Sequence, residues 1–175
     1  MSDSAVAGVP KTVVRPSRVS DAPRLSDFFL RAWREAGPGA LGFTGATEEA
    51  VREIASEEFL RKRLSSPNVQ MVVAEEGAAV VGFASLKRAS AREVELTGVV
   101  VLESYAGRGL GSRLLKKALD SARKRGYVTV TVKTECENAR AIAFYKGAGF
   151  TESGKTTEKV GRAKVALMVL AKKLR

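Results

Sequence analysis

The sequence predicts a single mixed α/β domain, and composition and periodicity both support this class. The 175-residue chain has 45% hydrophobic and 28% charged residues, which is typical of one globular domain. Apolar residues recur at helical spacing in some stretches, and β-branched runs of strand length lie between them. Because these patterns alternate along the chain, we expect a sheet with mixed pairing. Residues 1–11 are predicted to be a flexible tail and residues 12–175 the domain.

The first half of the domain is predicted to hold a strand, two helices and a β-hairpin. Pro23 lies near the start of the first helix, and Gly37 ends it. The second helix carries Glu49, Glu53 and Glu57 at intervals of four, so these carboxylates would share one helical face. The expected elements span residues 12–15, 23–34, 47–64, 69–74 and 80–86.

The second half is predicted to hold a central strand, an amphipathic helix, and two strands around a short helix. Gly98 within the central strand indicates either a β-bulge or a close approach of another backbone segment. Residues 149–156 match the phosphate-loop pattern G-x-x-x-x-G-K-[ST], but a helix precedes them and a strand follows. We therefore interpret the match as chance, with Gly149 as a helix C-terminal glycine and Gly154-Lys155 as a hairpin tip. The expected elements span residues 92–102, 110–124, 127–133, 139–146 and 164–170.

Composition excludes several kinds of chemistry. The chain has no histidine, which rules out Ser-His, Cys-His and His-metal sites, and its single cysteine, Cys136, rules out an intrachain disulfide. We expect no metal, no membrane-spanning segment, no signal peptide and a cytoplasmic location. The net charge of +11 fits either a nucleic-acid-binding protein or an enzyme for a polyphosphate-bearing cofactor. Aromatic residues make up only 6%, which disfavours nucleic acid as the partner.

A glycine-rich turn between the central strand and the amphipathic helix is the most informative stretch. Gly107, Gly109 and Gly111 alternate with other residues, so backbone N–H groups can approach an anion without obstruction by Cβ atoms. The start of the helix adds unpaired N–H donors and the positive end of the helix dipole. Ser112 can add a hydroxyl, and Arg108 or Arg113 can add a positive charge. A phosphate or pyrophosphate is the expected ligand, and a tight turn without a ligand is the alternative.

Two motifs resemble those of the GNAT superfamily of N-acetyltransferases. Residues 101–112, VLESYAGRGLGS, are similar to that family's pyrophosphate-binding strand, turn and helix, and residues 138–150, NARAIAFYKGAGF, are similar to its second signature. Ala106 departs from the usual Arg or Gln, and Glu103 from the frequent Pro. The resemblance implies an α/β (α+β) fold with a mostly antiparallel sheet of six to seven strands and about four flanking helices. Two central parallel strands of that sheet would splay apart.

The resemblance implies that acetyl-CoA is the co-substrate and that a primary amine attacks its thioester directly in a ternary complex. Backbone groups of Val99 and Val101 would hold the pantetheine arm between the splayed strands. Asn138 would hydrogen-bond the cofactor arm, cap the short helix, or do both. The remaining cofactor-binding residues that the resemblance implies are Ala106, Gly107, Arg108, Gly109, Leu110, Gly111 and Ser112.

Two residues are the candidate catalytic groups. Tyr145 matches the family's usual proton donor, and the ordinary tyrosine pKa, near 10, suits protonation of a departing thiolate. A packed aromatic residue is the alternative. Glu95 is the candidate general base, because it lies on the central strand just before the expected bulge and would share a side-chain face with Val99. Glu93 and Glu103 compete for this role. Cys136 is expected to be inert.

Two other functions stay open on the same fold. A nucleic-acid- or ribosome-associated binding protein would use the basic helices, and a non-catalytic acyl-CoA sensor would bind without turnover. The resemblance places the acceptor amine against the two early helices and the loop of residues 37–45. The row of carboxylates on the second helix would either hold a cation there or form an ordinary solvated face. The acceptor would be a small-molecule amine or a peptide amine, and the sequence does not identify which. It also does not show whether the chain forms a homodimer.

Overall fold

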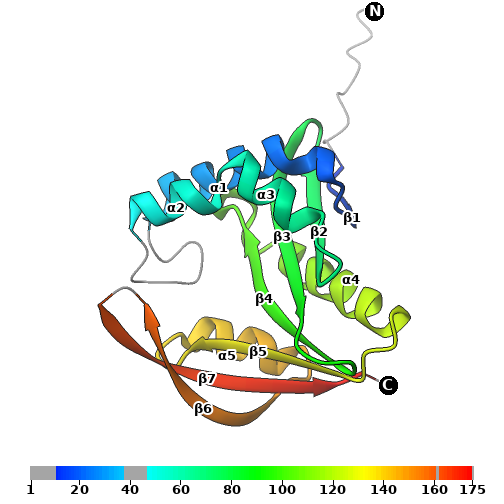
Figure 1. Ribbon diagram of the computed structural model, residues 1–175, viewed down its shortest axis with the longest axis vertical. Helices are drawn as coiled ribbons and strands as arrows, with labels where there is room; N and C mark the ends of the chain where they lie inside the picture. The colour runs from blue at the N-terminus through cyan, green and yellow to red at the C-terminus, as the bar shows by residue number, and fades with distance from the viewer. Residues whose placement is uncertain (1–10, 38–46, 161, 175) are drawn as a thin grey trace, which may run out of the picture.

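The computed structural model describes residues 11–37, 47–160 and 162–174, which fold around one seven-stranded sheet (Figure 1). The strands follow the order β1-β2-β3-β4-β5-β7-β6, and every neighbouring pair is antiparallel except β4 and β5. The strands are β1 (Val13–Pro16), β2 (Val69–Glu76), β3 (Ala79–Arg88), β4 (Glu93–Val101), β5 (Thr129–Glu135), β6 (Thr151–Val160) and β7 (Ala163–Lys173). The α-helices are α1 (Ala22–Ala36), α2 (Glu48–Ile54), α3 (Glu57–Leu64), α4 (Leu110–Lys124) and α5 (Ala139–Gly147). The predicted mixed sheet is confirmed, and residues 1–10 of the predicted tail lie outside the described residues.

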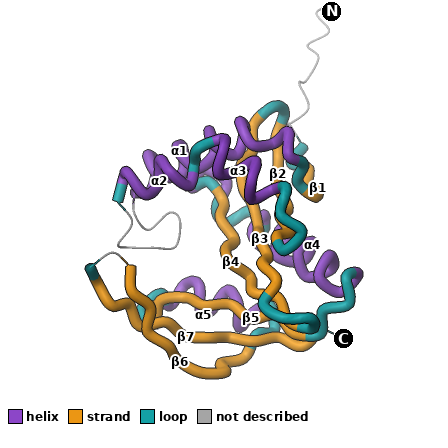
Figure 2. Tube along the Cα trace, in the orientation of Figure 1, coloured by secondary structure: helices purple, strands orange, loops and turns teal. Residues whose placement is uncertain are grey.

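The sheet divides where its parallel strands meet. β4 and β5 pair only from Glu93 to Leu96 on one strand and from Thr129 to Val132 on the other. Beyond these residues β4 continues beside β3, and β5 continues beside β7. Figure 2 shows the two groups of strands diverging from this short parallel contact. The predicted splay of two central parallel strands is therefore confirmed.

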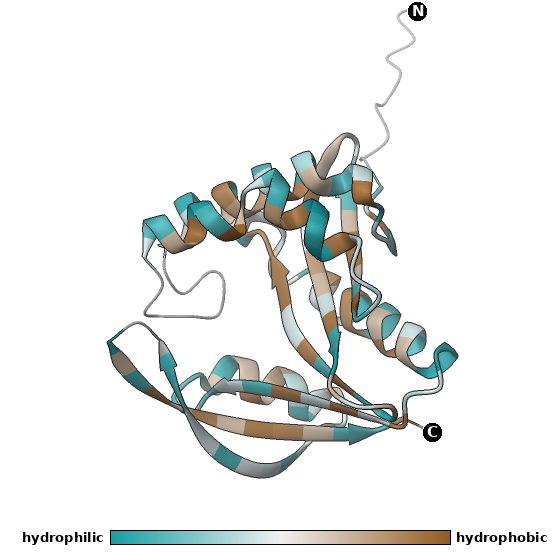
Figure 3. Cartoon of the chain, in the orientation of Figure 1, coloured by the Kyte–Doolittle hydropathy of each residue, from teal (hydrophilic) through white to brown (hydrophobic). Residues whose placement is uncertain are grey.

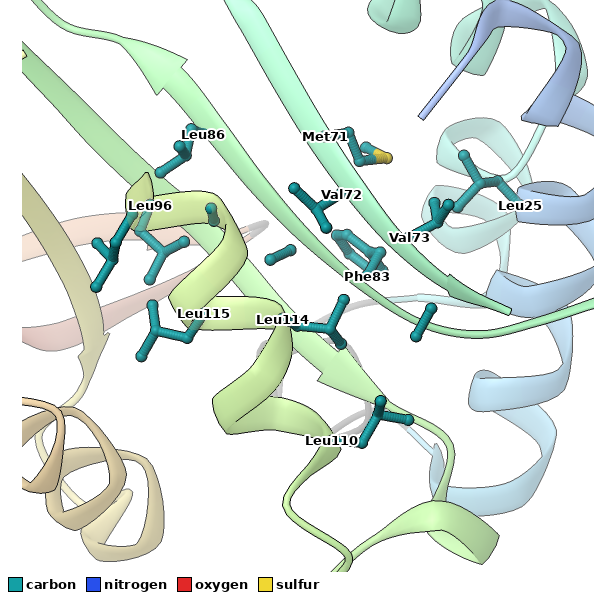
Figure 4. Packing of buried hydrophobic residues seen from close by; sticks show 14 of the residues in the cluster. Leu25, Met71, Val72, Val73, Phe83, Leu86, Leu96, Leu110, Leu114 and Leu115 are labelled. Carbon is teal, nitrogen blue, oxygen red and sulfur yellow. The ribbon is translucent and has the colours of Figure 1, made fainter. Parts of the chain in front are cut away.

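The two faces of the sheet are covered by different helices. On one face Phe83 of β3 packs against Phe28 and Phe29 of α1, with ring centroids 5.7 and 5.1 Å apart. We call this side the Glu95 face, because the pairing of Glu95 with Lys87 places both on the side of Phe83. On the opposite side, the α4 face, Leu114 and Leu115 of α4 pack over β3 and β4 (Figure 4). Apolar residues line the inner side of each helix in Figure 3.

The helix predicted over residues 47–64 is wrong, because the chain forms two helices there. α2 ends at Ile54, with Ala55 as its C-cap. Ser56 is the N-cap of α3, and its hydroxyl accepts a hydrogen bond from Phe59 N–H at 3.3 Å. The structure therefore has five α-helices rather than about four among the described residues. Glu57 begins the second of these helices, so it does not continue the helical face of Glu49 and Glu53.

The C-terminal hairpin also differs from its prediction. Gly154 and Lys155 lie within strand β6, and the turn falls between Val160 and Ala163. Ser153 is a bulge residue that lets this polar, glycine-containing stretch pair with β7. Gly149 has a φ of +86° directly after α5, as expected for a helix C-terminal glycine. Because a strand follows Gly154, the rejection of a phosphate loop is confirmed.

The expected bulge in β4 is confirmed, and it corrects one prediction about Glu95. Ser85 pairs with Gly98 and Leu86 pairs with Leu96, so Thr97 is the extra residue. Bulges shift the alternation of side chains by one position. Glu95 pairs with Lys87 while Val99 pairs with Ala84, and these β3 partners are three residues apart. Glu95 and Val99 therefore point to opposite faces rather than to a shared one.

Candidate active site

The glycine turn, residues 106–112, presents open backbone donors at the start of α4. Gly107 and Gly109 both have a φ of +73°, which L side chains rarely adopt, and a Cβ atom on either would meet nothing within 4 Å. Gly109 is the N-cap of α4 and provides no side-chain cap. The first α-helical bond runs from Arg113 N–H to Gly109 O at 3.1 Å. The preceding N–H groups, of Leu110, Gly111 and Ser112, point out of the helix end, where an anion is favoured.

The other residues of the turn play different structural parts. Ala106 N–H donates to Glu103 O at 3.0 Å, so its backbone closes a short 3₁₀ turn. The guanidinium of Arg108 lies 5.4 Å from the ring centroid of Tyr105, at an exposed position beside the turn. A Cβ atom on Gly111 would lie 3.6 Å from the Phe144 ring, so this glycine permits close packing of α4 against α5. The charge of Arg108 can reach an anion held by the turn.

Backbone groups of Val99 and Val101 face the gap between β4 and β5. Leu102 N–H donates to Val81 O at 3.0 Å, so Leu102 directs its backbone toward β3. Backbone groups alternate along an antiparallel strand, and Val99 and Val101 therefore direct theirs to the other side. No described strand pairs with β4 on that side beyond Leu96. The gap thus has free hydrogen-bonding groups along β4, and the chain leads from there into the glycine turn.

A groove of about 600 Å³ between α4 and α5 adjoins this turn. Ser112 and Phe144 line its end near the turn, and Lys172 of β7 lines it near the C-terminus of α5. Lys172 Nζ donates to Ala148 O at 2.5 Å, which caps a carbonyl at the end of α5. The volume lies within the range of small-molecule sites, and its charged lining consists of Lys116, Arg123 and Lys172 with Asp120, which pairs with the first two.

Tyr145 and Asn138 both lie on α5, at different depths. Tyr145 is 7% exposed and packs edge-on against Phe144 and Phe150, with ring centroids 5.2 and 5.7 Å away. Burial raises the pKa of Tyr145 to about 12, above the value near 10 expected from the sequence. Its hydroxyl is therefore fully protonated at neutral pH. Asn138 is exposed, and its Oδ1 accepts a hydrogen bond from Ala141 N–H at 3.0 Å, which confirms its cap role.

The Glu95 face brings together charged side chains from distant parts of the chain. Lys133 Nζ of β5 lies 2.6 Å from Glu158 Oε1 of β6 and 3.8 Å from Glu95 Oε1. Glu158 raises the pKa of Lys133 through a hydrogen bond. Arg63 reaches the same face from α3 and hydrogen-bonds Thr97 Oγ1 at 3.1 Å. The sequence analysis did not identify Arg63 or Lys133, because no local pattern marks two isolated basic residues in a chain with thirty.

The remaining expectations concern absences. The described residues contain no group of three or more metal-ligating acidic or cysteine side chains. Within the same residues, no helix is long and apolar enough to cross a membrane. Cys136 is a free, half-buried cysteine at the end of β5.

A sheet with one splayed parallel pair, a glycine turn at a helix start and a buried tyrosine on the next helix define an acyltransferase-like fold. Residues 28–150 match the model of the acetyltransferase (GNAT) family. The chain therefore belongs to the GNAT acetyltransferase family, which confirms the resemblance of its two motifs.

Individual relatives are consistent with this assignment. An uncharacterised N-acetyltransferase of Mycobacterium tuberculosis is 29% identical over 143 residues, which cover 82% of this chain and 91% of the relative. The N-alpha-acetyltransferase RimI of the same species is 38% identical over 96 residues, or 53% of this chain and 59% of that protein. The yncA protein of Salmonella typhimurium, solved with its cofactor acetyl-CoA, is 25% identical. That structure superimposes with a TM-score of 0.68 and covers 94% of this chain and 95% of its own.

Proposed function

We propose that the protein transfers the acetyl group of acetyl-CoA to a primary amine, by direct attack within a ternary complex. The observation that carries this proposal is the continuity of open backbone groups along the end of β4. Val99 and Val101 face the gap, and within a few residues the chain reaches the N–H groups of the glycine turn. A ligand with a long amide-containing arm and a pyrophosphate needs this sequence of contacts.

The chain's residues fit coenzyme A in three places. Backbone groups of Val99 and Val101 would bind the amides of the pantetheine arm. N–H groups of the glycine turn, with the charge of Arg108, would bind the pyrophosphate. The groove between α4 and α5 has room for further parts of the cofactor. Asn138, whose Oδ1 caps α5, keeps a side-chain amide that can donate to the arm. When bound, acetyl-CoA supplies the activated thioester.

The chemistry then requires one proton donor and one proton acceptor. Tyr145 keeps its proton at neutral pH and would donate it to the departing thiolate. Glu95 lies on the face opposite α4, so the acceptor amine would approach the gap from that side and lose its proton to Glu95, directly or through water. Glu93 and Glu103 are the competing bases, and Glu103 lies in the 3₁₀ turn after β4.

A thiol-release assay over a panel of amines tests the proposal. The relative named N-alpha-acetyltransferase makes peptides with free α-amines the first acceptors to try. We expect acetyl-CoA to raise the melting temperature at micromolar concentration and free thiol to appear only when an amine is added. Stabilisation without thiol release for any amine would instead favour a non-catalytic acyl-CoA sensor. Stabilisation by RNA or duplex DNA but not by acetyl-CoA would favour the nucleic-acid-binding alternative.

A further inference from the structure

Arg63 is a half-buried cation on the Glu95 face, and its contacts there are neutral. Its Nη2 donates to Ser85 Oγ at 3.2 Å and to Thr97 Oγ1 at 3.1 Å. Ser85 is only 1% exposed, so the guanidinium group reaches the surface of the sheet itself. Burial lowers the pKa of Arg63, but a guanidinium keeps its charge at neutral pH. The two hydroxyl groups position this charge without neutralising it.

Three other charges of the Glu95 face, those of Glu95, Lys133 and Glu158, are already paired with one another. Glu95 and Glu158 both lie within ion-pair distance of Lys133. On α3 itself, Arg61 pairs with Glu57 at 3.4 Å. No ion pair within the described part of the chain includes Arg63. A partly desolvated charge without a counter-ion is unfavourable, so an anion that binds there gains an interaction that the protein does not provide internally.

The position of Arg63 relates it to the candidate site. Two of its five N–H groups lie on Nη2, and the other three form no hydrogen bond to any residue that the structure describes. Its partner Thr97 is the bulge residue, two positions before Val99, which corresponds to about 7 Å along a strand. Arg63 is therefore held beside the part of β4 that leads to Val99, on the face from which the amine would approach.

We propose that Arg63 binds a carboxylate of the acceptor, so that the preferred substrate carries a carboxylate close to its reactive amine. This inference rests on the proposed acetyl transfer and names its substrate class. A guanidinium binds a carboxylate through two parallel N–H···O bonds, which fixes the direction of the substrate as well as its charge. The carboxylate has two sources, the α-carboxylate of a free amino acid or an acidic side chain next to a peptide N-terminus.

Matched acceptor pairs test the inference and separate the two sources. The first pair is alanine and alaninamide, and the second is the dipeptide amides Ala-Glu-NH₂ and Ala-Gln-NH₂. Charge-assisted hydrogen bonds predict that kcat/KM is about 10- to 100-fold higher for the carboxylate member of one pair. The pair that shows the preference identifies the source. Equal values in both pairs, or faster acetylation of spermidine than of any carboxylate-bearing amine, would overturn the inference.

Variants assign the preference to Arg63. Arg63→Met should remove it by lowering kcat/KM for the carboxylate member alone, with the affinity for acetyl-CoA unchanged. Arg61→Met, two residues away and exposed, is the matched control and should keep the preference. Equal loss for both members of a pair would mean that Arg63 only ties α3 to the sheet. If Arg63→Met does not fold, Arg63→Lys is the alternative variant. Lysine keeps a hydrogen-bond donor and a positive charge but cannot form two parallel bonds to a carboxylate. The preference for the carboxylate member should therefore fall about 10-fold.

A binding measurement distinguishes failure of this inference from failure of acetyl transfer. The carboxylate member of the preferred pair should raise the melting temperature of the wild type in the presence of coenzyme A, and should not raise that of Arg63→Met. Such a shift without any thiol release would sustain the anion site and refute the proposed reaction. Thiol release without an Arg63-dependent shift in melting temperature or preference for a carboxylate would support the proposed reaction and refute the anion site.

Discussion

The glycine turn and the Glu95 face lie on either side of the same gap, yet they are built from different groups. The turn presents N–H groups from consecutive residues, and its side chains contribute little to their direction. The Glu95 face presents side chains from β4, β5, β6 and α3, each held by a partner on another element. Substitutions in the turn should therefore matter only where the backbone conformation requires glycine. On the Glu95 face, each charged side chain should matter individually.

For an α-amine acceptor, the largest expected effect comes from Tyr145, a residue of neither region whose substitution tests chemistry apart from binding. Tyr145→Phe keeps the packing with Phe144 and Phe150 but removes the proton. We expect turnover to fall about 100-fold, the usual size of a general-acid contribution, with little change in acetyl-CoA affinity. Rapid-quench measurement of the chemical step checks this, with Tyr127→Phe as the control. Wild-type turnover in Tyr145→Phe would show that the thiolate leaves without this donor.

The next effect tests the backbone character of the glycine turn. Gly109→Val places a β-branched residue at a φ of +73°, so the turn must rearrange. We expect the dissociation constant for acetyl-CoA to rise about 30-fold by calorimetry, since several N–H donors lose their common direction.

Gly77→Val is the matched control for that variant. Gly77 has a φ of +59° with nothing within 4 Å of its Cβ position, but it lies in the β2–β3 turn. Both variants should lose stability to a similar degree, and only Gly109→Val should lose affinity. Equal affinity in the two variants would contradict the assignment of the pyrophosphate to the glycine turn.

Glu95→Gln tests the Glu95 face through a pH profile. An α-amine has a pKa near 8, so about one tenth of it is already neutral at pH 7. If Glu95 only removes the extra proton of the ammonium form, Glu95→Gln should lower kcat/KM about 10-fold at pH 7. The difference between variant and wild type should vanish above pH 9. For a lysine side chain, with a pKa near 10.4, the defect at pH 7 should be much larger. A defect of the same size at every pH would indicate a structural role for Glu95.

The smallest expected effect on acetyl-CoA affinity comes from Arg108, the charged side chain of the glycine turn. Arg108 is exposed and lies over the Tyr105 ring, so its charge would act on a bound pyrophosphate through solvent. Arg108→Met should weaken acetyl-CoA binding about 3-fold at low salt and less at high salt. Arg113→Met should have a smaller effect, because Arg113 donates to Thr12 O at 2.9 Å, which ties its guanidinium group to the residue before β1. A loss with Arg108→Met as large as that with Gly109→Val would contradict the contrast between the two regions.

The same contrast explains what the sequence predicted. The glycine turn and the α5 signature are runs of consecutive residues, so their spacing alone placed Gly109, Asn138 and Tyr145 on the observed elements. Arg63 lies 22 positions from Ser85 and 34 from Thr97, and only the fold brings them together. Side-chain placement on the Glu95 face therefore escaped prediction.

The secondary structure was predicted well where hydrophobic periodicity is strong. It was predicted poorly where a single residue determines the end of a helix or where pairing overrides composition. The β2–β3 hairpin, the central strand followed by α4, and the splayed pair were expected from the sequence and the family resemblance. The break between α2 and α3 depends on the Ser56 cap within an otherwise continuous helical pattern. β6 was missed because its sequence, TESGKTTEKV, is polar and contains glycine, and its pairing with β7 supplies the stability that its composition lacks.

The bulge at Thr97 has a consequence for insertions and deletions in β4. Ser85 pairs with Gly98 and Leu86 with Leu96, so removing Thr97 would leave both pairs intact and every other side chain on its present face. The strand would lose the local bend that a bulge imposes. β4 could then follow β5 past Leu96, where the parallel pairing now stops. The bulge therefore lies directly after the last residue of β4 that pairs with β5, and a chain without Thr97 would lose the bend at this point.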